Sequence, residues 1–261
     1  MSGGPGREVI KVAAMQSRGW IIGGVVALAG LLSVGSAAQP AGARARATAA
    51  PAEPVVVELF TAQGCAGCPE ANRAVEAVAE APGVIALTYA VDYWDYLGWT
   101  DTFAQPQFAE RQRAYRQALR LRAVATPQVI VDGRRQVPGA RPPALRAAIT
   151  QEAARRVFPP EIEFRDTGDK VGIGSGRAPA GGAEVLAVTY RPGAQTVQVQ
   201  DGDNRGQSVR HVNVVRRVVK LGDWTGRPVL FDLPGGIAAD EDVAVLVQAR
   251  GDRRILTAAV H

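Results

Sequence analysis

The sequence predicts an α/β domain over residues 55–158, followed by a small antiparallel β-rich, sandwich-like domain over residues 159–261. Two observations predict this division. Apolar runs alternate with helical patterns in the first half, whereas short β-rich runs separated by Gly, Pro and Asp fill the second. Pro159-Pro160 stands between them. With 261 residues and 47% hydrophobic content, the chain can form one large domain or two modest ones.

The first half opens with a predicted strand–helix–strand unit. Residues 55–60 form a nearly continuous apolar run, typical of a strand buried on both faces. Apolar residues at helical spacing follow over 71–79, and Pro82-Gly83 ends that helix before a second apolar run at 84–91. Because the unit spans fewer than forty residues, we expect parallel strands with a right-handed crossover.

Further elements are predicted from local patterns. An aromatic loop at 92–99 precedes a polar helix over about 107–121, whose arginines are expected on the solvated surface (Arg111, Arg113, Arg116 and Arg120). A strand at 128–132 turns at Asp132-Gly133 into a second strand at 134–137, and a helix covers about 142–156. In the second half, β-rich runs lie at 183–190, 209–221, 243–248 and 255–260.

The N-terminus has the layout of a secretory signal peptide. A short basic region precedes an uncharged apolar stretch at 20–34, and a small-x-small cleavage pattern follows at 36–38. We therefore expect a leader over residues 1–38, a disordered linker over 39–54, and an exported protein, periplasmic or secreted. The alternative is an uncleaved anchor, which is the one route by which we expect membrane contact.

The net charge of +5 does not indicate a nucleic-acid partner. Residues 1–47 contain five basic residues and one acidic residue, so most of the net charge belongs to the leader. The remainder of the chain carries 25 basic and 24 acidic residues.

The chain has two cysteines, Cys65 and Cys68, separated by two residues. A structural disulfide is one interpretation, although closing so short a loop stabilises by only about 2 kcal/mol, against about 3 kcal/mol for a 15-residue loop. A zinc site lacks further nearby ligands, because His211 and His261 both lie in the second half. A Cu(I) carrier is a third interpretation, but both methionines belong to the leader.

The redox interpretation has a physical mechanism. A strand, a turn and then a helix place Cys65 just before a helix N-terminus, where the dipole and free N–H groups favour a thiolate. Pro69 is compatible with a first helical turn. We expect Cys65, as the exposed cysteine, to be the nucleophile and Cys68 to be the resolving thiol. No metal and no cofactor beyond this disulfide are expected.

Four stretches carry a family resemblance: VELFTAQGCAGCP (57–69), VDYWDYLGW (91–99), TPQ (126–128) and RHVNVV (210–215). They resemble a secreted bacterial family catalogued as domain of unknown function 1223 and treated as thioredoxin-like. The resemblance implies a thioredoxin-like fold over 55–156 with a helical insertion near 93–121. Unlike the best-known thioredoxins, the motif has Ala66-Gly67 in place of Gly-Pro.

The resemblance also suggests roles for other residues. Thioredoxin-like proteins carry a cis-proline facing the dithiol, which implies a cis Thr126–Pro127 bond that docks an extended substrate. They also place an acid behind the dithiol to accept the resolving cysteine's proton, a role that Glu58 could fill. The alternative for Glu58 is pairing with an arginine.

The aromatic loop supplies the last candidates. Asp92, Tyr93 and Trp94 follow a parallel strand at its carboxyl end, where α/β ligand sites form. They are candidates for substrate binding, and packing of the inserted helix is the alternative. The sequence thus predicts an exported thiol–disulfide oxidoreductase acting on protein or small-molecule disulfides. Its rival is a non-enzymatic envelope-binding module with a structural Cys65–Cys68 bridge.

Overall fold

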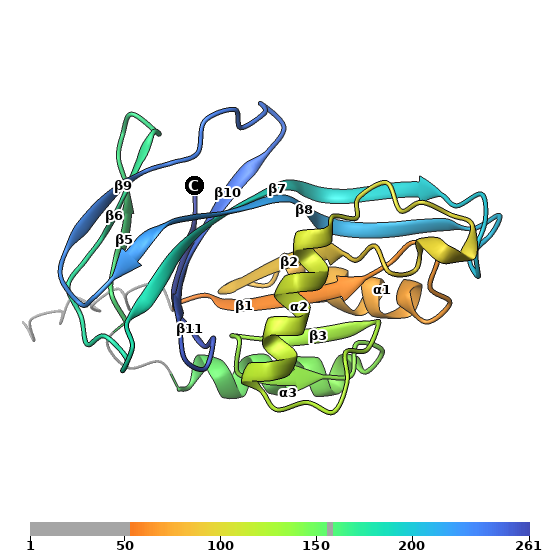
Figure 1. Ribbon diagram of the computed structural model, residues 1–261, viewed down its shortest axis with the longest axis horizontal. Coiled ribbons are helices and arrows are strands. Elements are labelled where there is room, and N and C mark those ends of the chain that lie inside the picture. Colours follow the sequence, from red (N-terminus) through yellow and green to blue (C-terminus); the bar gives the residue numbers. More distant parts are fainter. Residues whose placement is uncertain (1–52, 156–158) are drawn as a thin grey trace, which may run out of the picture. The chain divides into compact units, whose positions relative to one another are not determined.

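The computed structural model describes residues 53–155 and 159–261, which contain three α-helices, one short 3-10 helix and eleven β-strands (Figure 1). The predicted leader over residues 1–38, and all of the predicted linker except its last two residues, lie outside the described residues. No helix in the described ranges is long and apolar enough to cross a membrane.

The predicted strand–helix–strand unit is confirmed. β1 (Val55–Thr61) runs parallel to β2 (Val84–Ala90), and α1 (Cys68–Ala79) connects them. α1 begins at Cys68, and Pro69 lies in its first turn. Proline is favoured there, because main-chain N–H groups of the first turn have no acceptor within the helix and proline has no N–H. The second cysteine is therefore the first residue of a helix.

The predicted hairpin is confirmed as well. After the 3-10 helix η1 (Asp95–Leu97) and helix α2 (Pro106–Ala118), β3 (Gln128–Val131) pairs antiparallel with both β1 and β4 (Arg135–Val137). Helix α3 (Pro142–Ala153) follows. These elements occupy the positions that turn chemistry and apolar spacing predict.

The second half of the chain contributes to two sheets. β5 (Ile162–Phe164), β6 (Lys170–Ile173) and β9 (Val229–Asp232) form a small antiparallel sheet. The other four strands, β7 (Ala183–Gln198), β8 (Ser208–Trp224), β10 (Asp242–Ala249) and β11 (Ile255–Val260), join the strands of the first half.

The predicted fold class, a thioredoxin-like α/β domain with a helical insertion followed by a separate β sandwich, is wrong. The described chain is mostly β, and one eight-stranded mixed sheet runs in the order β11-β10-β7-β8-β2-β1-β3-β4. Residues 55–158 and residues 159–261 thus contribute strands to the same sheet.

Side-chain hydrogen bonds help to join β2, from the first half of the chain, to β8, from the second half. β8 runs parallel to β2 in register at Thr88 and Val214. The Thr88 hydroxyl donates to the Val212 carbonyl over 2.6 Å, and the Asn213 amide donates to the Ala86 carbonyl over 3.0 Å. Polar side chains therefore supplement a short main-chain ladder at the point where the two groups of strands meet.

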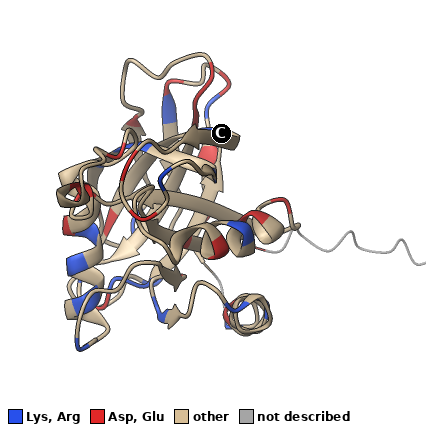
Figure 2. Ribbon diagram, turned by 90° about the vertical axis from the view of Figure 1, so that its right-hand side faces the viewer, with Lys and Arg blue, Asp and Glu red and all other residues tan. Residues whose placement is uncertain are grey.

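Helices cover both faces of the sheet around β1. Successive side chains of β1 point to opposite faces, so Val57 and Leu59 pack with α1 and α3, whereas Val56 and Phe60 pack with α2. Lys and Arg residues, drawn in blue, lie along α2 at the left of Figure 2. Both cysteines of the CxxC motif belong to the cluster on the α2 side.

Candidate functional site

Cys65 and Cys68 form a disulfide with a Cα–Cα distance of 5.4 Å. Cys65 lies in the loop after β1, and Cys68 begins α1. We call residues 65–68 the CxxC turn, because the Cys68 N–H donates to the Cys65 carbonyl over 3.1 Å and closes it. The CxxC turn therefore lies at the carboxyl end of β1 and at the N-terminus of α1.

Both cysteine side chains are shielded from solvent. Cys65 is 2% exposed and Cys68 is 0% exposed, whereas Ala66 and Gly67 between them are exposed. From the sequence, Cys65 is predicted to be the accessible cysteine. In the disulfide form, the difference in exposure between the two cysteines is small.

The segment before β3 lies against the CxxC turn. The Thr126–Pro127 bond is cis, as the resemblance implies. The Thr126 carbonyl oxygen lies 3.7 Å from Cys65 Sγ, and a Cβ built on Gly67 would lie 3.5 Å from Pro127 Cδ. In the reduced protein, the Cys65 thiol can donate to the Thr126 carbonyl, since a thiol is a weak donor.

Tyr93 and Gln112 hold this segment in place. The Tyr93 hydroxyl donates to Gln112 Oε1 over 2.9 Å and contacts the Thr126 hydroxyl. Gln112 in turn donates to the Ala125 carbonyl over 2.8 Å and to Gln128 Oε1 over 2.9 Å. Burial, the largest influence, raises the pKa of Tyr93. Sequence reasoning missed Gln112, although it lies four residues after Phe108 on the apolar stripe of α2.

The other two candidates in the aromatic loop, Asp92 and Trp94, take no part in the hydrogen bonds described above. Asp92 is half-buried, and its carbonyl accepts from the Asp95 N–H in the turn that starts η1. Trp94 packs against the α2-side core. Within the described ranges, neither side chain hydrogen bonds to the CxxC turn. Tyr96 is the exposed aromatic residue of this loop, with 79% of its surface in solvent.

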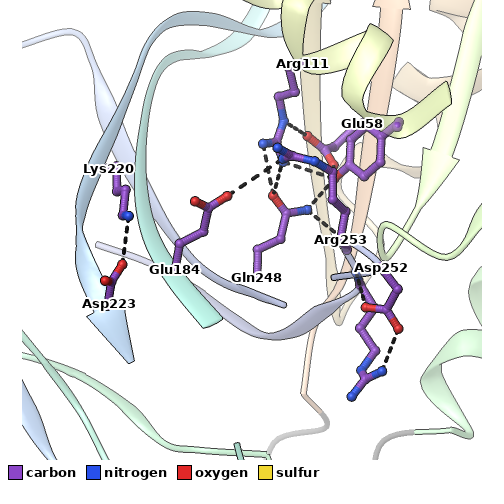
Figure 3. A network of polar contacts seen from close by, with 10 residues as sticks. Glu58, Arg111, Glu184, Lys220, Asp223, Gln248, Asp252 and Arg253 are labelled. Atoms are coloured by element: carbon purple, nitrogen blue, oxygen red, sulfur yellow. Dashed lines mark hydrogen bonds and ion pairs between the residues drawn. The ribbon is translucent and has the colours of Figure 1, made fainter. Parts of the chain in front are cut away.

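Glu58 is fully buried and paired with an arginine (Figure 3). Arg111 Nε donates to Glu58 Oε1 over 2.7 Å, and the Tyr115 hydroxyl donates to the other oxygen. Of the two arrangements that the sequence leaves open, pairing with an arginine is the one observed. No hydrogen bond joins Glu58 to either cysteine in the described chain.

The assignment of Arg111 to the solvated surface is wrong. Its side chain is 7% exposed and also donates to Gln248 and to the Tyr115 hydroxyl, so it joins α2 to β10 as well as to β1 (Figure 3). Burial alone would lower the pKa of Arg111, but the Glu58 carboxylate and the neighbouring tyrosines raise it well above its ordinary value. Arg113 and Arg116 are exposed, as expected.

The loop before Cys65 is held by residues that sequence reasoning missed. Asp101 accepts from the Gln63 N–H over 2.6 Å and from the Phe103 N–H over 2.9 Å. Burial, the largest influence, raises the pKa of Asp101 to about 6. Asn204 donates to the carbonyls of Gln63 and Cys65, each over 2.8 Å. Neither residue belongs to a recognisable motif, so no sequence signal indicates these contacts.

The histidines lie apart from each other. His211 is buried against Phe103, with ring centroids 5.5 Å apart, and burial lowers its pKa to about 4. His261 packs against Phe164 near the small sheet. No group of three or more His, Cys, Asp or Glu residues in the described ranges could hold a metal ion.

Comparisons with known proteins give one family match and two similar solved structures. Residues 56–248 match the family described as "Protein of unknown function (DUF1223)". An X-ray crystal structure of an Agrobacterium tumefaciens protein is 37% identical, with a TM-score of 0.66, over 81% of this chain and 95% of that chain. HBP35 of Porphyromonas gingivalis is 16% identical, with a TM-score of 0.55, over 81% of this chain and 76% of that chain, a likeness of fold alone. No curated protein matches the chain.

Proposed function

The chain belongs to the DUF1223 family, and from that premise we propose that it is an exported thiol–disulfide oxidoreductase acting on protein or small-molecule disulfides. The observation that supports this proposal is the placement of the Cys65–Cys68 disulfide. It lies at the N-terminus of α1, where main-chain N–H groups favour a thiolate, and against the Thr126–Pro127 segment.

The reaction that we propose proceeds by two exchanges. The Cys65 thiolate of the reduced protein attacks one sulfur of a substrate disulfide, forms a mixed disulfide and displaces the first substrate thiolate. The Cys68 thiolate then attacks Cys65 Sγ, forms the Cys65–Cys68 bond and displaces the second thiolate. The substrate gains two electrons, the protein loses two, and the two cysteine protons end on the released thiols. The reverse sequence oxidises a substrate dithiol.

Burial of both cysteines favours a structural disulfide, which is the feature that the alternative function, an envelope-binding module, requires. A cysteine of which only 2% is exposed offers little surface for the approach of a substrate that exchange requires. In this case the bridge would only fix the turn between β1 and α1, and exchange would need unfolding.

Equilibration with glutathione distinguishes the two functions. The native protein is incubated in buffers of varied reduced-to-oxidised glutathione ratio, quenched with an alkylating agent and analysed by mass spectrometry. We expect the Cys65–Cys68 pair to move reversibly between dithiol and disulfide within minutes. A disulfide that stays intact until denaturant is added would overturn the proposed activity and support the structural bridge.

A further inference from the structure

The turn joining β7 to β8 reaches the CxxC turn from the far part of the chain. The two strands pair from Ala183 and Trp224 to Gln198 and Ser208, and residues 199–207 connect them. We call residues 199–207 the hairpin tip. Figure 1 shows it at the same end of the sheet as the connection between β1 and α1.

The side chain of Asn204, in the hairpin tip, contacts the main chain at and just before the CxxC turn. Its side chain is buried, with 1% of its surface exposed, and its amide nitrogen lies 2.8 Å from the Gln63 and Cys65 carbonyl oxygens. The Cys65 carbonyl is also the acceptor of the Cys68 N–H that closes the CxxC turn. The Cys65 carbonyl oxygen therefore accepts two hydrogen bonds, one from the Cys68 N–H within the turn and one from Asn204, 139 positions later in the chain.

The approach of the tip is close and is supported by the main chain. The Asp203 N–H donates to the Gly64 carbonyl over 3.3 Å. Gly202 has a φ of +77°, and a Cβ built on it would lie 3.4 Å from Gly64 Cα. Within the tip, the Gln207 N–H donates to the Asn204 carbonyl over 2.9 Å, so Asn204 is fixed by a turn of its own.

We propose that Asn204 is a positioning residue that holds Cys65 at the separation from Cys68 at which the disulfide forms. Reduction removes the covalent link, and the main chain of residues 65–67 gains conformational freedom that disulfide formation must remove. By fixing the Cys65 carbonyl, Asn204 limits that freedom and raises the effective concentration of one thiol at the other. This inference rests on the proposed function in one respect: the Cys65–Cys68 pair must exist both as a disulfide and as a dithiol.

A thermodynamic cycle tests this role. The free energy of unfolding is measured in denaturant for the oxidised and the chemically reduced protein, in the wild type and in Asn204→Ala. The change in the difference between the two redox forms gives the change in the disulfide-forming equilibrium of the folded state. We expect that equilibrium constant to fall about threefold to tenfold in Asn204→Ala, the range that the net loss of one hydrogen bond produces when it weakens the oxidised form more than the reduced form.

Two further variants complete the test. Arg205→Ala is the matched control, because Arg205 neighbours Asn204 in the tip and its side chain is exposed; we expect its equilibrium constant to match the wild type. Asn204→Ser, a milder change, gives the same measurement if Asn204→Ala does not fold. Equal loss of stability in both redox forms would overturn the positioning role and leave Asn204 a purely structural residue.

The outcome is independent of the test of activity. The cycle uses protein that is reduced or oxidised before the measurement, so it needs no exchange in the native state. A native disulfide that is inert to glutathione would therefore refute the oxidoreductase while the Asn204 coupling is still measured. Rapid exchange with no coupling would refute the role of Asn204 alone.

Discussion

Arg111 Nε donates to Glu58 Oε1 over 2.7 Å in the core between α2 and β1, where the two side chains are 7% and 0% exposed (Figure 3). Gln248 on β10 donates to the Tyr115 hydroxyl over 2.8 Å and accepts from Arg111. The pair thereby connects α2 to strands from both halves of the chain. Charges removed from water in this way depend on each other, because either one alone would be buried without compensation.

Arg111→Met is expected to destabilise the protein by about 3–5 kcal/mol, since it leaves the Glu58 carboxylate buried without its counter-ion. Denaturant unfolding measures this change. Arg113→Met, on the exposed side of the same helix, is the matched control and is expected to stay within about 0.5 kcal/mol of the wild type. Equal effects of the two substitutions would show that the Glu58–Arg111 pair contributes nothing.

Glu58→Gln tests whether Glu58 also takes part in exchange. Its hydrogen-bond partners are Arg111 and Tyr115. We therefore expect lower stability but an unchanged rate of disulfide release in the folded variant. Stopped-flow exchange with glutathione at neutral pH measures that rate. Slower release with the fold intact would support the role of proton acceptor that the sequence suggests.

The contrast between Glu58 and Arg111 shows what local sequence reasoning reveals. A carboxylate within an apolar strand is conspicuous, so its burial and need for a partner are predictable. Arg111 lies among other arginines on a polar helix, and charge alone indicates solvent exposure. Its position between Phe108 and Tyr115, three residues after one and four before the other, is the signal that places it on the buried stripe.

Local sequence patterns predict the strands of the large sheet but not all of the pairings between them. β1, β2, β3 and β4 are predictable because apolar runs, helical spacing and a Gly turn are local features. The strands of the second half are predictable one by one, but the partner of β8 is not. Pairing of β8 with β2 depends on Val214 meeting Thr88, a contact between distant segments that no periodicity encodes. For this reason the sequence predicts two separate domains where the structure has one shared sheet.

Asp101 and His211 are expected to give opposing pH dependences of stability. Both are connected to Phe103, one through its N–H and the other through its ring. The pKa of Asp101 rises from 3.8 to about 6 in the folded protein, so its contribution is present below pH 3.8 and is lost as the pH rises through 6. The pKa of His211 falls from 6.5 to about 4, so its contribution is present above pH 6.5 and is lost as the pH falls through 4.

Single variants separate these two contributions, each about 3 kcal/mol in size. In Asp101→Asn the His211 contribution remains, and we expect stability to fall more steeply than in the wild type as the pH drops from 6.5 to 4. In His211→Phe the Asp101 contribution remains, and stability is expected to rise as the pH drops from 6 to 4. Unfolding free energies measured at half-unit pH intervals check this, and three parallel profiles would contradict it.

Tyr93→Phe is expected to slow exchange while costing about 1 kcal/mol of stability. The substitution removes the hydroxyl that joins Thr126 to Gln112, so the segment against Cys65 loses one of its supports. Tyr96→Phe is the control, because Tyr96 lies in the same loop and is exposed. Exchange rates with glutathione for the two variants provide the measurement. An unchanged rate in Tyr93→Phe would remove Tyr93 from the site.

The two cysteines are expected to play different parts in thiol–disulfide exchange. Exchange passes through a mixed disulfide that one thiolate forms and the other releases. Cys65 lies outside α1 with its sulfur 3.7 Å from the Thr126 carbonyl, whereas Cys68 is the first residue of the helix and is completely buried. We therefore expect Cys68→Ser to accumulate a covalent adduct at Cys65, and Cys65→Ser to accumulate little.

Glutathione disulfide is the probe for this comparison, and the adducts are counted by mass spectrometry without reductant. Because the disulfide form exposes Cys65 by only 2%, adduct formation also reports whether the reduced form opens access to this sulfur. Similar trapping by both variants would contradict the assignment of Cys65 as the nucleophile. If neither variant forms an adduct unless denaturant is present, the sulfurs stay inaccessible in the native protein, and the disulfide acts as a structural bridge between β1 and α1.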